Sequence, residues 1–271
     1  MWGDHLHHGY YSAEADQSTR KSNREAQEEM IERVLEWAGV TQFTNDQRMV
    51  DVGCGLGGSS RHIIRKFGGG SAQGITLSPY QSQRGNELSA AAGLKDHVHL
   101  QVADALHQPF DNDTFDLVWS LESGEHMPDK RKFVGELTRV CAPGGRVIIV
   151  TWCHRVLHTT ESRLKEDEQR LLDEICEAYY LPQWCSIADY ERLFVENGFD
   201  DVRTADWSEQ VAPFWGEVIK SALTLRGVLG LLRSGWTTIR GALVMPLMAQ
   251  GLQRGVVRFA LITGVKRKVN E

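Results

Sequence analysis

Glycines at alternate positions follow a short apolar run near residue 50, and this arrangement restricts the fold more than any other feature. Residues 50–60 read VDVGCGLGGSS and lead into RHIIR at 61–65. The pattern predicts a buried strand, a turn too tight for side chains and the first turn of a helix. Glycine permits positive φ and lets a ligand approach the backbone. Since a helix N-terminus also offers unpaired N–H groups, we expect a nucleotide-like ligand here.

Strand and helix patterns alternate from this turn to about residue 152. The strands are apolar on both faces, which is typical of a parallel sheet covered by helices on both sides. We therefore predict an α/β fold in which ligands bind beyond the carboxyl ends of the strands. Helices are expected near 22–38, 58–67, 79–92 and 130–140, and strands at 71–76, 98–102, 115–120 and 146–152, besides the one ending at Asp51.

The pattern after residue 152 is less regular. Charged amphipathic helices are expected at 162–180 and 187–197, and further strands at 201–205 and 256–263. The fifty residues between these strands are long for a loop and have helical, apolar content. We interpret them as a cap over the ligand site. The predicted division is a core with an N-terminal lid at 1–207, a helical cap at 208–255 and the last core strand at 256–271.

Basic residues gather in this C-terminal part of an otherwise acidic chain. Nine Lys and Arg residues follow from Lys220 onward, against the single acid Glu271. Arg226, Arg233 and Arg240 are seven residues apart, which places them on one side of a helix. A basic amphipathic cap predicts peripheral contact with an anionic membrane surface through residues 220–268. A solvated helix that only covers a substrate pocket remains the alternative.

Composition excludes several classes of protein. The net charge of -6 and the pI near 5.9 argue against nucleic acid as a partner. No apolar run approaches the roughly 18 residues of a membrane span, and we expect no leader peptide within the chain. Five cysteines without paired spacing indicate free thiols in a reducing compartment.

Residues 1–11 are rich in aromatic side chains and histidines. Metal binding is disfavoured because no Cys, Asp or Glu partner has suitable spacing. A solvated leader is a second interpretation. We favour a lid whose rings pack over a bound ligand; it contains Trp2, His5, His7, His8, Tyr10 and Tyr11.

The end of the second predicted strand disfavours a nicotinamide dinucleotide. The chain reads GITLSPYQ at 74–81, without the acid or arginine that such a cofactor requires there. The glycines also lack the G-x-G-x-x-G spacing. A dehydrogenase is therefore a weak hypothesis.

Several motifs resemble a known family. DVGCGLG at 51–57, ADA at 103–105 and APGG at 142–145 resemble class I S-adenosylmethionine-dependent methyltransferases. A closer resemblance, over essentially the whole chain, is to the γ-tocopherol C-methyltransferase family of plants and algae, which includes alkaloid N-methyltransferases. It is carried by WGDHLHHGY at 2–10, GITLSP at 74–79, ESGEHMPDK at 122–130, TWCHR at 151–155, YLPQWCS at 180–186, DWS at 206–208 and LRSGW at 232–236.

The resemblance implies a Rossmann-like fold of seven strands, the last antiparallel, and S-adenosylmethionine as the cofactor. Glycines of the first turn would hold its methionine part, with an acid orienting the turn or meeting the ammonium group. Hydroxyl, apolar and amide groups would surround the ribose, and a second acid would accept from the adenine amino group. The residues implied are Asp51, Gly53, Gly55, Gly57, Thr76, Leu77, Gln81, Asp104, Ala105 beside the adenine, and Ser120 near the sulfonium.

Catalysis on a tocopherol would need a base near the phenol, because removing the phenol proton activates the ortho ring carbon. His126 is the first candidate and His154 the second, since histidine titrates near neutrality. Glu122 and Glu125 could bind or orient the acceptor. For either histidine, a purely structural role is the alternative.

Three hypotheses follow. The first is a methyltransferase acting on γ- and δ-tocopherol at a plastid membrane, with its leader absent from this sequence. The second is an indole alkaloid N-methyltransferase that accepts picrinine-type indolines. The third, a non-catalytic binding or scaffold protein, is disfavoured by the intact positions around Gly53 and Asp104. The acceptor is expected to be a hydrophobic small molecule, and a homo-oligomer is left open.

Overall fold

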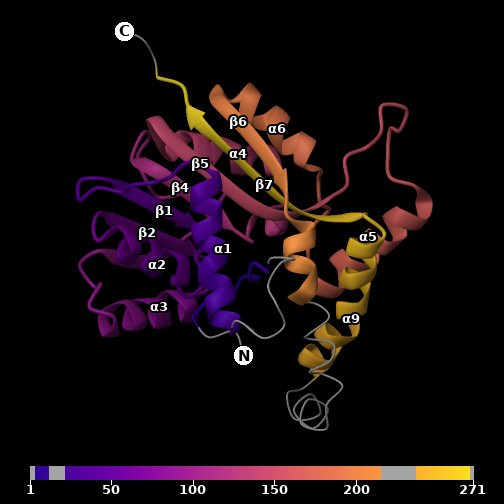
Figure 1. Ribbon diagram of the computed structural model, residues 1–271, viewed down its shortest axis with the longest axis horizontal. Helices are drawn as coiled ribbons and strands as arrows, with labels where there is room; N and C mark the ends of the chain where they lie inside the picture. The colour runs from indigo at the N-terminus through magenta and orange to yellow at the C-terminus, as the bar shows by residue number, and fades with distance from the viewer. Residues whose placement is uncertain (1–3, 12–21, 215–235, 269–271) are drawn as a thin grey trace.

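Seven strands form one sheet in the order β3-β2-β1-β4-β5-β7-β6 (Figure 1). The computed structural model describes residues 4–11, 22–214 and 236–268. The pairs among the first five strands are parallel, whereas β7 runs antiparallel to both β5 and β6. The predicted α/β sheet with an antiparallel last strand is confirmed. The strands are β1 Arg48–Val52, β2 Ser71–Thr76, β3 Val98–Val102, β4 Phe115–Leu121, β5 Cys141–His154, β6 Phe199–Asp206 and β7 Val257–Lys266.

Helices cover the sheet on both faces and bury one apolar cluster on each. Met30 of α1 and Ile63 of α2 belong to the first cluster, and Phe133 of α4 and Tyr190 of α6 to the second. Burial of this apolar surface is the main stabilising contribution to the fold. The helices are α1 Asn23–Trp37, α2 Gly58–Phe67, α3 Pro79–Ala91, α4 Lys130–Val140, α5 Glu166–Tyr179, α6 Ile187–Glu196 and α9 Trp236–Gln253, with a 3₁₀ turn, η1, at Gly124–His126.

The central strand β1 explains why the sequence forms a doubly covered sheet. Successive strand residues point to opposite faces, and Met49 enters the first cluster while Val50 and Val52 enter the second. Both faces are thus apolar. Only the turn after the carboxyl end of β1 can remain open to a ligand, and Gly53 begins this turn.

Two boundaries differ from the sequence prediction by four residues or more. The strand expected from residue 146 begins at Cys141, because Cys141 pairs with Phe115 before the register shifts toward Leu117. The glycine pair after Pro143, which was expected to lie between the helix at 130–140 and the strand at 146–152, therefore lies within β5. The helix expected from 162 begins at Glu166, where the Glu168 carboxylate accepts a hydrogen bond from the Lys165 N–H, 3.0 Å away.

The predicted cap is described only in part. Residues 208–214 are helical, and α9 packs against α5. Residues 215–235, which include Arg226 and Arg233, lie outside the described residues, so the division at 208–255 stays a prediction. Among the described helices, none is long and apolar enough to cross a membrane. All five cysteines are free thiols.

Candidate active site

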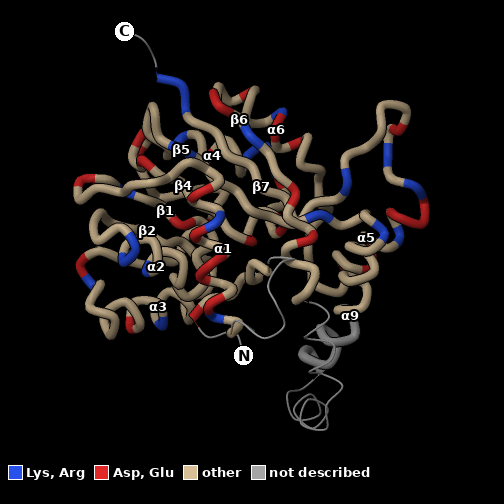
Figure 2. Tube along the Cα trace, in the orientation of Figure 1, with Lys and Arg blue, Asp and Glu red and all other residues tan. Residues whose placement is uncertain are grey.

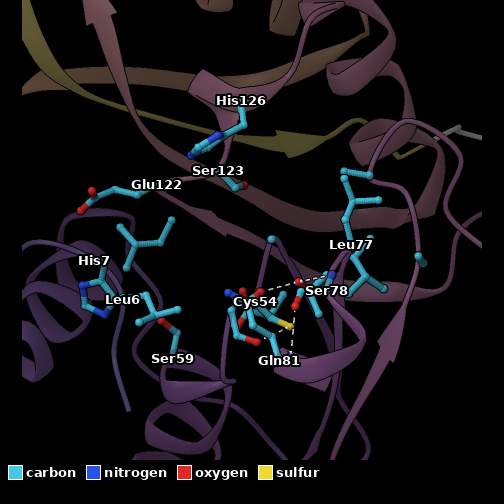
Figure 3. Close-up of a pocket in the computed structure, with 18 of the residues that line it drawn as sticks. Leu6, His7, Cys54, Ser59, Leu77, Ser78, Gln81, Glu122, Ser123 and His126 are labelled. Carbon is cyan, nitrogen blue, oxygen red and sulfur yellow. Dashed lines mark hydrogen bonds between the residues drawn. The ribbon is translucent and has the colours of Figure 1, made fainter. Parts of the chain in front are cut away.

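A pocket of about 590 Å³ opens beyond the carboxyl ends of β1 to β4 (Figure 3). This is the position expected for a ligand of a parallel sheet. The pocket gathers ten residues predicted from the sequence, which come from four separate strand ends. They are Asp51, Gly53, Gly55, Thr76, Leu77, Gln81, Asp104, Ala105, Glu122 and His126.

The glycine turn after β1 leaves no room for side chains. Gly53 has φ of +80° and Gly55 has φ of +53°, a region that only glycine adopts readily. A Cβ atom on Gly53 would lie 2.3 Å from the Cβ of Ser123 in the turn after β4. The two turns therefore touch, and the bare backbone of Gly53 faces the pocket. Gly57, the N-cap of α2, packs instead near Leu100 and is not among the lining residues.

Asp51 lies at the base of this turn with only 3% of its surface exposed. The Ser60 hydroxyl donates a 2.6 Å hydrogen bond to its Oδ2 atom. Burial nevertheless dominates and raises the pKa of Asp51 to about 6. A cationic group bound beside Asp51 would favour the carboxylate and lower this pKa.

The turn between β2 and α3 presents neutral groups where a dinucleotide-binding site has an acid. The Thr76 hydroxyl donates to the Gln81 side-chain oxygen at 2.7 Å, which orients the Gln81 amide. Ser78 caps α3 by accepting from the Gln81 N–H at 3.3 Å. Leu77 projects between them with 74% of its surface exposed. The site thus offers hydroxyl, amide and apolar contacts to a ribose and its base.

Asp104 supplies the carboxylate beyond β3. Its Oδ1 atom accepts a 2.9 Å hydrogen bond from the Leu106 N–H. This bond is the largest of the interactions that hold the pKa of Asp104 below its usual value. Asp104 is therefore a carboxylate at neutral pH, and its acceptor capacity suits an amino group. Ala105 lines the pocket beside it.

The N-terminal segment, residues 4–11, packs on the glycine turn, and four of its residues line the pocket. A Cβ atom on Gly55 would lie 3.0 Å from the Leu6 Cδ1 atom, and one on Gly58 would lie 2.5 Å from the Asp4 carbonyl oxygen. The Gln27 amide of α1 ties the segment down by donating to the carbonyls of His5 and His7, at 3.2 and 2.6 Å. Trp2, predicted in the same lid, lies outside the described residues.

Two histidines of the segment, His5 and His7, are kept neutral. Burial is the main reason that the pKa of His5 falls to about 3, and the neighbouring His7 lowers it further. Burial also lowers the pKa of His7. The two rings lie 3.2 Å apart between His5 Nδ1 and His7 Nε2. Within the described part of the chain, no group of three or more His, Cys, Asp or Glu side chains is arranged to hold a metal ion.

Glu122 follows β4 and joins the N-terminal segment to the sheet. Its Oε1 atom accepts the His8 N–H at 2.5 Å, and its Oε2 atom lies 2.6 Å from His8 Nδ1. The Trp152 indole donates to Oε2 at 3.3 Å. Burial opposes the charge, but His8 outweighs it and holds the pKa of Glu122 below the usual value. Glu122 also has φ of +51°, a conformation unfavourable for a residue with a side chain.

His126, in η1, lines the pocket from the same turn as Glu122 (Figure 3), whereas the imidazoles of His5 and His7 line it from the N-terminal segment. Burial, assisted by the positive charge of Lys130, lowers the pKa of His126. The ring is thus neutral at physiological pH and able to accept a proton. No hydrogen bond from it to another described residue limits this role.

Three predicted residues lie behind the pocket and do not line it. Glu125 accepts a 2.8 Å hydrogen bond from Thr151; burial, followed by the nearby charge of Glu122, raises its pKa to about 8. His154 ends β5 with its Nδ1 atom 2.7 Å from the Arg155 carbonyl. Ser120 is fully buried and bonds to the Ser123 hydroxyl at 2.7 Å.

Sequence reasoning missed several lining residues that adjoin the predicted ones. Ser123, for example, donates to the Val52 carbonyl at 2.8 Å and so fixes the contact between the turns after β1 and β4. Its position one residue after Glu122 was the available signal. The other residues missed in this way include Leu6, Cys54, Ser59, Ser78, Met127 and Pro128.

The pocket fits S-adenosylmethionine. The turn around Gly53 packs on Ser123 without room for a Cβ atom and so presents bare backbone to the pocket, and Asp51 and Asp104 line the pocket with carboxylate acceptors. The methionine part would be held by Asp51 and the glycine turn, the ribose by Thr76 and Gln81, and the adenine by Asp104.

Substitution of Gly53 by alanine should weaken binding of S-adenosylhomocysteine at least about tenfold, which corresponds to roughly 1.4 kcal/mol. The added methyl group enforces strain at positive φ, which costs on the order of 1–3 kcal/mol, and it displaces Ser123. The matched control is Gly135→Ala, since Gly135 in α4 has no neighbour within 4 Å of an added Cβ atom. Calorimetric titration gives both affinities. Equal affinities of the two variants for S-adenosylhomocysteine would show that cofactor binding does not require the bare backbone of Gly53.

Substitution of Glu125 by glutamine should change the pH dependence of stability. The folded protein keeps the Glu125 proton up to a pKa of about 8, whereas the unfolded chain releases it near 4.3. The free energy of unfolding of the unsubstituted protein should therefore fall as pH rises between these values, by up to roughly 1.4 kcal/mol per unit.

The glutamine variant has no such proton, so its stability relative to the unsubstituted protein should rise from pH 5 to pH 8. Urea unfolding at both pH values measures the difference. Glu174→Gln, at an exposed position of α5, is the control. If the free energy of unfolding changed equally with pH in Glu125→Gln and in the unsubstituted protein, the raised pKa of Glu125 would be contradicted.

Comparisons with known proteins agree with this geometry. A geranyl diphosphate C-methyltransferase of Streptomyces coelicolor, solved with S-adenosylhomocysteine, is 21% identical and superposes with a TM-score of 0.77, over 97% of this chain and 91% of the other. A family model described as "Methyltransferase domain" matches residues 50–149. At this identity the superposition supports the fold, and the family match covers β1 through most of β5.

Curated sequences match almost the whole chain. A probable tocopherol O-methyltransferase of Oryza sativa is 57% identical over 97% of this chain and 73% of its own length. Norajmaline N-methyltransferase of Rauvolfia serpentina is 36% identical, over 99% and 92%. The chain is thus an S-adenosylmethionine-dependent methyltransferase of class I, and it belongs to the tocopherol methyltransferase family.

Proposed function

We propose that the protein transfers a methyl group to an aromatic ring carbon of γ-tocopherol, and of δ-tocopherol, forming α- and β-tocopherol. The observation that carries the proposal is the neutral imidazole of His126 in the cofactor pocket. An amine acceptor needs no such base, because its nitrogen is itself the nucleophile. The higher identity to the tocopherol enzyme of rice than to the norajmaline enzyme, 57% against 36%, favours the same acceptor.

The cofactor supplies a methyl group already activated on a sulfonium, so the residues of the protein chiefly position the acceptor and exclude water. His126 accepts the phenol proton, which increases electron density at the ortho carbon. Glu122 keeps the N-terminal segment closed through His8. Leu6 and Asp4 thereby cover the glycine turn. Once the methyl group bonds to the ortho carbon, this carbon releases its own ring proton and the phenol oxygen regains a proton, so that one proton in all passes to solvent.

The acceptor is identified by incubating the protein with S-adenosylmethionine labelled with ¹³C in its methyl group. One reaction contains γ-tocopherol in detergent micelles, and the other contains a picrinine-type indoline. We expect a new carbon-bound methyl group on the tocopherol ring with the phenol retained, as determined by NMR of the product. A methyl ether, or transfer only to the indoline nitrogen, contradicts the proposal.

Replacing His126 by asparagine should lower kcat by roughly 10²–10⁴-fold, the usual contribution of a general base. Affinity for S-adenosylhomocysteine should stay within about twofold, because the glycine turn is untouched. His154→Asn is the matched control, since His154 does not line the pocket, and its kcat should change by less than about tenfold. A larger loss of kcat in His154→Asn than in His126→Asn would identify His154, and not His126, as the general base.

We also propose that the protein resides in the plastid and contacts an anionic membrane surface through residues 220–268. The rice and Arabidopsis relatives are named chloroplastic. In the described part of this region, however, four basic residues already pair with acids, which reduces their attraction for lipid. Figure 2 colours Lys and Arg, and Asp and Glu, along the whole described trace. The pairs are Arg254 with Asp167, Arg258 with Asp206, Lys266 with Asp113 and Arg267 with Asp200.

Lys220, Arg226, Arg233, Arg240 and Lys268 are the basic residues of the region outside these pairs. We assign membrane contact to the three arginines, because their spacing of seven residues would place them on one side of a helix. Their joint replacement by glutamine should reduce sedimentation with anionic liposomes severalfold, because a basic residue near such a surface contributes about 1 kcal/mol. A control variant removes three exposed charges elsewhere, at Arg84, Lys95 and Arg131. If both variants sediment like the unsubstituted protein, the cap covers the acceptor pocket without binding membrane.

A further inference from the structure

Two cysteines of the chain lie side by side where β5 ends and α6 begins. Cys153 is the penultimate residue of β5 and is fully buried. Cys185 precedes Ser186, the N-cap of α6, and is partly exposed. Both side chains belong to the same apolar cluster, on the α4 and α6 face of the sheet. Neither has a part in the proposed reaction.

Their backbones are held together in parallel. The His154 N–H donates to the Cys185 carbonyl at 3.1 Å, and His154 forms a parallel bridge with Ser186. Equivalent residues of neighbouring parallel strands lie about 4.8 Å apart and face the same side. Cys153 and Cys185 are the preceding equivalent pair. This separation lies within the Cα range of roughly 4.4–6.8 Å that a disulfide requires.

The surroundings make the two thiols unequal. The adjacent Cys153 thiol lowers the pKa of Cys185, and the charge of Lys130 acts in the same direction, against burial and Asp189. Burial raises the pKa of Cys153 instead. Cys185 is thus the more acidic and the more accessible thiol. Since the thiolate is the nucleophile, Cys185 is placed to attack and Cys153 to follow.

We propose that Cys153 and Cys185 form a site of reversible oxidation, at which a small-molecule or protein disulfide converts the two thiols into one intramolecular disulfide. The Cys185 thiolate attacks one sulfur of the incoming disulfide, forms a mixed disulfide and releases the first thiolate. Cys153 then attacks the Cys185 sulfur and releases the second. Two electrons pass to the external disulfide, and the two protons of the dithiol end on the two released thiols.

Oxidation is expected to be selective for Cys153 and Cys185 because the other three thiols have raised pKa values. Burial raises the pKa of Cys176 to about 11 and that of Cys141 to about 12, and it raises that of Cys54 as well. Such thiols are inert at neutral pH. Cys153 directly follows Trp152, whose side chain belongs to the cluster on the other face of the sheet and whose indole bonds to Glu122. Lys130, which acts on both thiols, donates to the carbonyls of Gly124, Glu125 and Met127 around η1.

The test uses the unsubstituted protein with glutathione disulfide at neutral pH, followed by alkylation and peptide mapping by mass spectrometry. We expect a crosslinked pair of peptides that contains Cys153 and Cys185, with the other three cysteines alkylated. Dithiothreitol should restore both thiols. Glutathione retained on Cys185, a crosslink to another cysteine, or the absence of any modification would each refute the proposal.

Two variants separate the roles of the thiols. Cys153→Ser should stop at a stable mixed disulfide on Cys185, and Cys153→Ala gives the same readout if the serine is not tolerated. Cys185→Ser should leave Cys153 unmodified. Cys176→Ser, which removes another buried thiol, should still form the crosslink. Modification of Cys153 in Cys185→Ser at the rate of the unsubstituted protein would show that the order of attack is wrong.

Discussion

The contact between the turns after β1 and β4 is the constraint on which the site depends. Gly53 can approach Ser123 only because it has no Cβ atom, and the Ser123 hydroxyl fixes the approach by bonding to the Val52 carbonyl. This contact brings the cofactor turn next to Glu122 and His126. A donor held by the first turn thus faces the residues that would treat the acceptor, and positioning of this kind is a large part of catalysis of group transfer.

A second connection closes the site from the N-terminal side. Glu122 accepts two hydrogen bonds from His8, and Gln27 of α1 holds the carbonyls just before it. The position of the N-terminal segment therefore depends on the Glu122 carboxylate, which belongs to the turn after β4. The unfavourable φ of Glu122 is consistent with a residue whose position is imposed by its partners. Glu122 thus both holds the N-terminal segment in place and lines the pocket beside the turn that carries His126.

The extent to which sequence determined the result differs between the fold and the site. The sheet was predictable because strands such as β1 are apolar on both faces, and because glycines at 53 and 55 mark the ligand turn. The resemblance placed the antiparallel β7. Predicted boundaries were wrong where a residue distant in sequence sets the end of an element. Phe115 pairs with Cys141 and so extends β5 toward the N-terminus, beyond the predicted start at residue 146.

Within the site, the position of a residue near a strand end did not suffice to predict whether its side chain reaches the pocket, because tertiary packing determines this. His126 and His154 both follow strand ends, yet only the 3₁₀ turn η1 brings His126 to the pocket. Glu122 and Glu125 are three residues apart, but Glu122 gains His8 as a partner while Glu125 lies buried beside Thr151. Their pKa values consequently move in opposite directions. Such differences arise from long-range contacts that a local pattern does not contain.

The central claim is that one pocket holds the cofactor between the glycine turn and Asp104 with its sulfur toward His126. A crystal structure with S-adenosylhomocysteine tests this claim most directly. The account predicts the amino-acid end of the ligand beside Asp51 and Gly55, the adenine at Asp104 and Ala105, and the sulfur facing the turn that carries Glu122 and His126. A ligand bound in the reverse direction, or outside this pocket, would contradict it.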